Sequence, residues 1–171
     1  MRNFRLTRLI VFACLLCGAF TARAIVIFST YSPYHYIEVV DEGGTRTLSF
    51  NGSRETRMNR DNPLQGHFEY TEYFHMPWLW NTNIKRVLMI GLGGGSTQRS
   101  YQHYYTKVML DTVELDPEVV KVAKNYFRVT ETPTHRIYLQ DGRIFLRRAT
   151  NIYDVILMDA YSTTRYGSSI P

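Results

Sequence analysis

A glycine-rich segment in the middle of the chain constrains the fold more than any other feature. The apolar run 87–90 leads into residues 91–97, Gly-Leu-Gly-Gly-Gly-Ser-Thr, where four glycines fall within five positions. A buried strand that enters a glycine turn and then a helix presents backbone N–H groups and a helix N-terminus to a ligand. Glycine suits such a turn because a Cβ atom would obstruct a positive φ or the close approach of a ligand. Taken alone, the pattern fits a simple tight turn equally well.

Apolar and helical segments alternate on the C-terminal side of this turn. The pattern predicts strands at 107–115, 136–140 and 153–158, with helices at 96–105, from Asp116 onward and at 143–149. The last strand is nearly all apolar, so we expect it to be buried on both faces. Asp116-Pro117 is typical of a helix start, with an acidic N-cap followed by proline. The alternation predicts an α/β fold with a right-handed, doubly wound parallel sheet.

A smaller unit precedes this sheet. Residues 34–40, 45–50 and 53–58 predict a three-stranded antiparallel β-meander, with a tight turn at Asn51-Gly52 and a polar loop to residue 66. Residues 67–80 predict a mostly helical segment that Pro77 ends or bends. A helix there would place Tyr70, Tyr73 and Phe74 on one side. We therefore divide the chain into 1–24, 25–66 and 67–171.

Residues 1–24 are predicted to be a secretory signal peptide. Three arginines precede the apolar run 9–20, and Ala22-Arg-Ala24 fits a cleavage site before Ile25. Cleavage would make the protein periplasmic or secreted, and without it the protein would be membrane-anchored or cytoplasmic. The segment holds both cysteines and four arginines without an acid, so the remaining chain has a net charge of +1 instead of +5. That charge does not indicate a nucleic-acid surface, and no nucleic-acid partner is expected.

Three acidic residues follow successive strands at the ligand-binding edge of the predicted sheet. Glu114 lies 23 residues after Gly91, where it suits a carboxylate that binds both hydroxyls of a ribose. Asp141 could accept from an adenine amino group, with Gly142 leaving room for the base, and Asp159 faces the same crevice. Each acid alone fits a helix cap or a solvated charge equally well. Together, beside the glycine turn, they predict a nucleoside site.

The histidines predict no metal site. The five of them show no ligand spacing with cysteine or paired acids, so we expect surface or packing roles for the set His35, His67, His75, His103 and His135.

The sequence resembles the spermidine synthase family, the aminopropyltransferases built on the class I methyltransferase fold. The matching stretches run in order along the chain, at residues 32–39, 70–72, 87–96, 113–117, 141–142 and 153–159. The family moves an aminopropyl group from decarboxylated S-adenosylmethionine to a diamine, usually putrescine. The resemblance therefore implies a nucleoside donor as co-substrate, a polyamine acceptor, no tightly bound cofactor and a possible homodimer.

The resemblance also implies roles for single residues. Glu114 would bind the ribose of the donor, and Asp141 with Gly142 the adenine. Asp159 would hold and deprotonate the attacking amine, and Tyr70 would line the diamine site. The glycine loop would hold the methionine-derived side of the donor through Gly91, Gly93, Gly94 and Gly95.

Several positions depart from the family pattern. Gly94 stands where the family usually has an aspartate that helps to hold the donor's amine, Ser162 replaces a second acid after Asp159, and His35 replaces a glutamine. Each change removes a group that recognises a cation or the donor. The family sheet has seven strands and the fourth predicted strand here ends at residue 158. The resemblance thus implies that the chain corresponds to the N-terminal half of the domain. We expect a fragment or truncated product that holds part of the nucleoside site.

Two alternatives remain open from the sequence. An S-adenosylmethionine-dependent methyltransferase would share the fold and the nucleoside residues, and Gly94 makes it less remote. A non-catalytic extracytoplasmic protein that has kept the fold would agree with the export signal, because a secreted protein does not normally meet S-adenosylmethionine. Preference for the decarboxylated or the intact donor separates the two enzymes.

Overall fold

The computed structural model describes residues 23–160, 162–164 and 167–169. The signal-peptide prediction therefore falls almost wholly outside the described residues, as does the side chain of Ser162. No helix in the described ranges combines the length and the apolar character that crossing a membrane requires. The elements follow in the order β1 (Ile25–Tyr31), β2 (Tyr36–Glu42), β3 (Thr45–Phe50), β4 (Ser53–Asn59), the 3₁₀ helix η1 (Glu69–Leu79), β5 (Arg86–Ile90), α2 (Ser96–Tyr104), β6 (Met109–Glu114), α3 (Pro117–Tyr126), β7 (His135–Leu139), α4 (Gly142–Arg148), β8 (Val155–Met158), β9 (Ser162–Thr164) and β10 (Gly167–Ser169).

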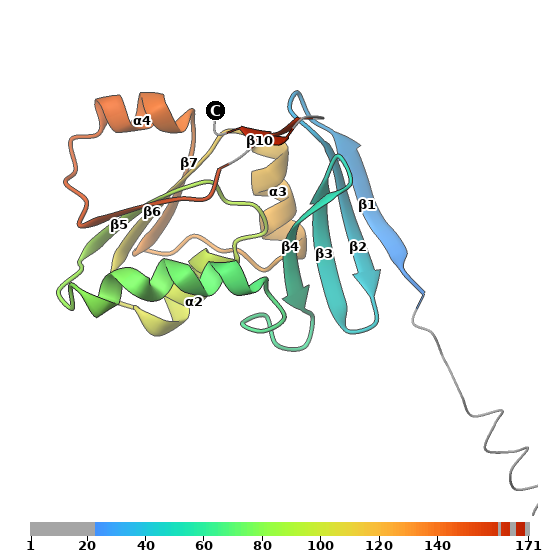
Figure 1. The fold of residues 1–171 in the computed structure, drawn as a ribbon, viewed down its shortest axis with the longest axis horizontal. Helices are drawn as coiled ribbons and strands as arrows, with labels where there is room; N and C mark the ends of the chain where they lie inside the picture. Colours follow the sequence, from blue (N-terminus) through green and yellow to red (C-terminus); the bar gives the residue numbers. More distant parts are fainter. Residues whose placement is uncertain (1–22, 161, 165–166, 170–171) are drawn as a thin grey trace, which may run out of the picture.

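The N-terminal unit is an antiparallel sheet in the order β1-β2-β3-β4 (Figure 1). Asn51 and Gly52 both have positive φ values, 51° and 86°, at the turn between β3 and β4, so the predicted hairpin is confirmed. The prediction of three strands was wrong, because β1 adds a fourth at the edge. Its register against β2 shifts between Val26 and Phe28, and this irregularity interrupts the alternation that marks a regular strand.

The second sheet is parallel, in the order β7-β6-β5-β8, as the doubly wound prediction requires. Helix α2 covers one face, where Tyr101 packs with Val87 and Leu110. Helix α4 lies over the opposite face, where Phe145 packs against a cluster that includes Leu88 (Figure 1). From β5 the chain adds β6 and β7 on one side and then returns to add β8 on the other side, so the strand order switches between β5 and β8. Such folds bind ligands at this switch point.

Strand β8 is less buried than its sequence predicts. Val155 and Leu157 pack on the α2 side, but Ile156 and Met158 on the other side remain 51% and 52% exposed. In the described part of the chain β8 is an edge strand, and α4 packs over β5, β6 and β7 instead of over β8. The expectation of burial on both faces was therefore wrong for one face.

The segment before β5 is a 3₁₀ helix, not a regular α-helix. The predicted aromatic side of the segment is split between the protein interior and solvent. Tyr70 and Phe74 make an edge-to-face contact at 6.0 Å, whereas Tyr73 is 67% exposed. Pro77 lies inside the helix and does not end it.

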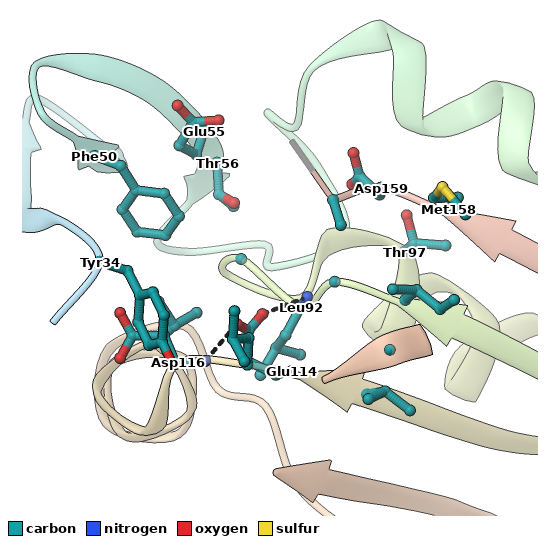
Figure 2. Close-up of a pocket in the computed structure, with 18 of the residues that line it drawn as sticks. Tyr34, Phe50, Glu55, Thr56, Leu92, Thr97, Glu114, Asp116, Met158 and Asp159 are labelled. Atoms are coloured by element: carbon teal, nitrogen blue, oxygen red, sulfur yellow. Dashed lines mark hydrogen bonds between the residues drawn. The ribbon is translucent and has the colours of Figure 1, made fainter. Parts of the chain in front are cut away.

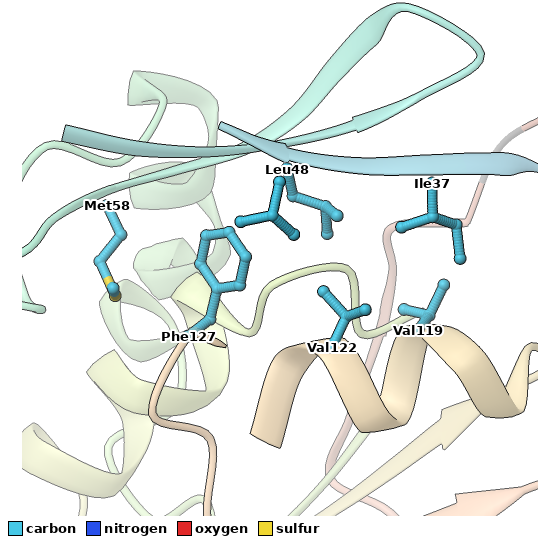
Figure 3. Close-up of a cluster of buried hydrophobic side chains, with 7 residues drawn as sticks. Ile37, Leu48, Met58, Val119, Val122 and Phe127 are labelled. Atoms are coloured by element: carbon cyan, nitrogen blue, oxygen red, sulfur yellow. The ribbon is translucent and has the colours of Figure 1, made fainter. Parts of the chain in front are cut away.

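Helix α3 joins the two sheets. The Asp116 side chain accepts a hydrogen bond from the Glu118 N–H at 2.9 Å and Pro117 occupies the first turn, so the predicted helix start is confirmed. The face toward the N-terminal sheet is fully buried, and Figure 3 shows Val119, Val122 and Phe127 of this segment against Ile37, Leu48 and Met58. On the other side, Ala123 packs with Leu92 of the glycine loop. This packing fixes the N-terminal sheet beside the ligand-binding edge of the parallel sheet.

Candidate active site

A cavity of about 530 Å³ lies between the N-terminal sheet and the carboxyl ends of the parallel strands (Figure 2). Its walls come from the turn before β2, from β3 and β4, from η1, from the glycine loop with the start of α2, and from the residues that follow β6, β7 and β8. The structure brings seven of the predicted site residues together at this edge. The cavity is lined by Gly91, Gly93, Glu114, Asp141, Gly142, Asp159 and Tyr70.

The four glycines of the loop serve different purposes. Gly91 has a φ of +100°, and a Cβ atom on it would lie 2.2 Å from the carbonyl oxygen of Asp159, so the ends of β5 and β8 touch only because this residue is glycine. Gly94 and Gly95 do not line the cavity. A Cβ atom on Gly94 would lie 2.6 Å from Cγ2 of Thr56, and one on Gly95 would lie 2.3 Å from Cγ2 of Val129. Packing accounts for these two glycines, and their donor-binding role stays a prediction.

Glu114 is held by two backbone groups. Its Oε2 accepts a hydrogen bond from the Leu92 N–H and its Oε1 from the Asp116 N–H, both at 2.9 Å (Figure 2). Burial raises the pKa of Glu114, and these backbone N–H groups oppose that effect. Each carboxylate oxygen keeps a second lone pair for a ligand, which is the arrangement that two adjacent hydroxyl groups need.

Asp116 was predicted only as a helix cap, yet it also lines the cavity. Its Oδ1 makes the capping bond, while its Oδ2 is buried without a hydrogen-bond partner. The spacing Glu114-Leu-Asp116 at a strand end was a usable signal, because alternate residues leave a strand on the same side.

Unsatisfied buried polar atoms gather at this cavity. Among the described residues five buried side-chain polar atoms lack a partner, and four of them belong to residues that line it: His35 Nδ1, Thr97 Oγ1, Gln98 Oε1 and Asp116 Oδ2. Buried polar groups are almost always paired in native proteins, so the concentration of these atoms at the cavity makes it suited to a polar ligand. His35 stacks on Phe50 with ring centroids 4.6 Å apart. His35 therefore has the packing role that was expected, and it lines the cavity as well.

Asp141 caps α4 and lies at the rim of the cavity. Its Oδ1 accepts from the N–H groups of Arg143 and Ile144 at 2.9 and 3.0 Å. The backbone hydrogen bond from Ile144 holds the pKa of Asp141 below its ordinary value, with the Arg143 side chain adding to the effect. A Cβ atom on Gly142 would lie 2.7 Å from Cγ2 of Ile90, so packing requires this glycine as well.

Asp159 and Tyr70 meet across the cavity from β8 and η1. The Tyr70 hydroxyl donates a hydrogen bond to Asp159 Oδ2 at 3.3 Å. Burial raises the pKa of Asp159 to about 6; the tyrosine hydrogen bond opposes this, and the Glu55 carboxylate adds to it. Burial and the Asp159 charge raise the pKa of Tyr70, so this phenol stays protonated as a donor. A carboxylate with a pKa near neutrality is suited to accept a proton.

The fold and the cavity together define a Rossmann-like protein of the methyltransferase type, with an acid-lined site at the switch point of its sheet. A family model described as the spermine/spermidine synthase domain matches residues 67–166. The chain belongs to this family.

Individual relatives agree with this assignment. The chain is 30% identical over 160 residues to the polyamine aminopropyltransferase of Vibrio vulnificus, an alignment that covers 87% of this chain and 53% of the relative. The structure resembles spermidine synthase from Thermotoga maritima, with a TM-score of 0.67, 26% identity and coverage of 81% and 48% of the two chains. It also resembles a spermidine synthase in complex with the transition state analogue AdoDATO, with a TM-score of 0.67, 27% identity and coverage of 84% and 48%. The chain thus spans about half the length of the relatives that it matches.

Proposed function

We propose that the protein is a spermidine synthase-like aminopropyltransferase, which moves an aminopropyl group from decarboxylated S-adenosylmethionine to a diamine such as putrescine. The observation that carries the proposal is the Asp159–Tyr70 pair, which lies in the same cavity as the carboxylates suited to a nucleoside. A protein that only binds nucleosides would need the nucleoside-binding carboxylates but not the Asp159–Tyr70 pair. The pair adds a proton acceptor where a second substrate can approach.

The donor is proposed to bind along the edge of the parallel sheet. Glu114 takes the ribose hydroxyls, with Asp116 Oδ2 as a second acceptor beside it. Asp141 at the rim takes the adenine amino group through Oδ2, because Oδ1 already caps α4 and the hydrogen bond from Arg143 to Oδ2 is long at 3.4 Å. The sulfonium side then faces the glycine loop and the end of β8. This orientation brings the reacting carbon toward Asp159.

The transfer needs one proton acceptor and no metal in this scheme. An aliphatic ammonium has a pKa of about 10, so the attacking amine is protonated in water and unreactive. Asp159 accepts a proton from that ammonium, and the freed nitrogen lone pair attacks the carbon next to sulfur. The new C–N bond forms as the C–S bond breaks, and its electrons neutralise the sulfonium to give methylthioadenosine. The Asp159 carboxylate also attracts the cationic acceptor into the cavity.

The test is turnover by the full chain, measured as methylthioadenosine release in the presence of putrescine. Asp159→Asn should lower the rate by about 10²- to 10⁴-fold, the range typical for removal of a general base, while donor binding stays within about threefold. Glu42→Gln is a matched charge control, because Glu42 is exposed and does not line the cavity. Turnover that Asp159→Asn leaves unchanged would overturn the proposed role, and absence of turnover in a folded sample that binds the donor would overturn the activity.

A further inference from the structure

A further carboxylate, that of Glu55, enters the cavity from the N-terminal sheet. Glu55 on β4 is 8% exposed and lines the cavity, although the sequence around it, Arg54-Glu-Thr-Arg57, has the polar character of a surface strand. Figure 2 shows Glu55 and Asp159 on opposite walls of the cavity.

A β-bulge explains why Glu55 points inward. Thr56 pairs with Leu48 and Arg54 pairs with Ser49, so one extra residue, Glu55, is inserted between two consecutive pairs of the β3–β4 ladder. In a regular strand, neighbouring side chains lie on opposite faces, and one of Glu55 and Thr56 would face solvent. Both are buried here. Bulges of this kind redirect side chains next to functional sites.

Thr56 fills the space beside the glycine loop. Its Oγ1 accepts a hydrogen bond from the Gly94 N–H at 2.8 Å, and its Cγ2 would lie 2.6 Å from a Cβ atom on residue 94. The loop is therefore closed against β4, and position 94 has no room for an acidic side chain. The residue next to Thr56 brings a carboxylate to the same side of the cavity.

The charge of Glu55 acts on the proposed reaction centre. It raises the pKa of Asp159 and of Tyr70, in each case as a smaller effect than burial, so its carboxylate lies within electrostatic range of both groups. Glu55 and Asp159 line the same cavity, and the negative potential of two carboxylates attracts a cation. The arrangement is suited to an ammonium group.

We propose that Glu55 binds the terminal ammonium of the donor's aminopropyl group. This inference rests on the proposed function, because it assumes the decarboxylated donor. Glu55 then supplies from the N-terminal sheet the carboxylate that the glycine loop lacks at Gly94. Its negative charge also repels the carboxylate of intact S-adenosylmethionine, so the same residue sets the preference between the two donors.

The experiment compares two nucleosides by calorimetric titration of the full chain. Decarboxylated S-adenosylmethionine carries the ammonium on a sulfonium centre, and methylthioadenosine has the same nucleoside with a neutral thioether sulfur and no ammonium. Glu55→Gln should weaken binding of the decarboxylated donor by about 10- to 100-fold, the range for loss of a charge-assisted hydrogen bond, and leave methylthioadenosine binding within about threefold. Glu55→Asp keeps the charge, so its affinity for the decarboxylated donor should lie between those of the wild type and Glu55→Gln. Glu42→Gln should change the affinity for neither ligand.

The outcomes separate this inference from the proposed function. Equal weakening of both ligands would show that Glu55 only maintains the cavity, and unchanged binding of both would show that it does not contact the donor. Either result overturns the inference about Glu55. The proposed function stands in both cases as long as the wild-type chain binds the decarboxylated donor. If Glu55→Gln does not fold, Glu55→Asp decides the question. The inference is overturned if Glu55→Asp binds the decarboxylated donor as tightly as the wild type and binds methylthioadenosine more weakly. Failure of the wild-type chain to bind either nucleoside would overturn both.

Discussion

Replacing Asp159 by asparagine should stabilise the protein at neutral pH while it removes the proposed base. The fold raises the pKa of this carboxyl from 3.8 to about 6, chiefly by burial, so folding disfavours its charged form. Above pH 6 the ionised Asp159 carboxylate therefore destabilises the native state. As the pH falls from 6 toward 3.8, the native state binds a proton that the unfolded state does not, and the lost stability is recovered.

The magnitude comes from the same values. Each pKa unit is worth about 1.4 kcal/mol, and a rise from 3.8 to about 6 corresponds to about 3 kcal/mol of destabilisation by the charged Asp159. Asparagine has nearly the same shape, and its amide oxygen can still accept from Tyr70. Asp159→Asn should therefore unfold in urea with a free energy about 2 to 3 kcal/mol higher than the wild type at pH 7.5, and the gap should close near pH 4.

A second aspartate provides a control of opposite sign. Backbone hydrogen bonds from Lys85 and Arg86 to the exposed Asp154 hold its pKa below the ordinary value. Asp154 stabilises the fold when ionised, and this contribution is lost as the pH falls, so Asp154→Asn should be less stable than the wild type at pH 7.5. The reasoning is refuted if Asp159→Asn is no more stable than the wild type at pH 7.5, or if its advantage is the same at pH 4.

Three further results are expected. The pH profile of kcat/KM should fall on the acid side with an apparent pKa near 6, and Glu55→Gln should move this limb to lower pH because it removes a charge that raises the pKa of Asp159; an unmoved limb in a variant that still turns over would contradict this. Gly94→Ala should cost about 1 to 3 kcal/mol in urea unfolding, and Thr56→Ser, which removes the Cγ2 atom 2.6 Å away, should recover part of that cost in the double variant; simple additivity would contradict the packing account. Asp116→Asn keeps its helix-capping acceptor and should change stability by less than about 0.5 kcal/mol, yet weaken methylthioadenosine binding about tenfold, and unchanged affinity would exclude Asp116 from the nucleoside site.

The parallel sheet and much of the cavity were predictable from the sequence. The carboxyl ends of parallel strands share one edge, so residues that follow successive strands must converge. This rule placed Glu114, Asp141 and Asp159 beside the glycine loop, and the structure brings all three to one cavity. The separate likeness to spermidine synthases agrees with the family match of residues 67–166.

The contributions of the N-terminal sheet were not predictable in the same way. Glu55 faces the cavity because of a one-residue bulge, and a bulge reverses the inward and outward assignment that alternation gives. The β8 side chains Ile156 and Met158 are half exposed because α4 packs over the other strands, which depends on helix placement and not on local pattern. Phe74 and Trp78 of η1 pack against the core of the parallel sheet, and these tertiary contacts are likewise not visible in the local sequence pattern.

The measurement that tests the account most directly is a calorimetric titration of the folded, full-length chain with decarboxylated and intact S-adenosylmethionine. In the proposed binding mode, carboxylates line the donor's side of the cavity and Glu55 binds its amine end. We predict that the decarboxylated donor binds at least about tenfold more tightly, because the intact donor adds a carboxylate that these residues repel. Equal or tighter binding of the intact donor would contradict the account and favour a methyltransferase, and binding of neither would favour a non-catalytic protein that has kept the fold.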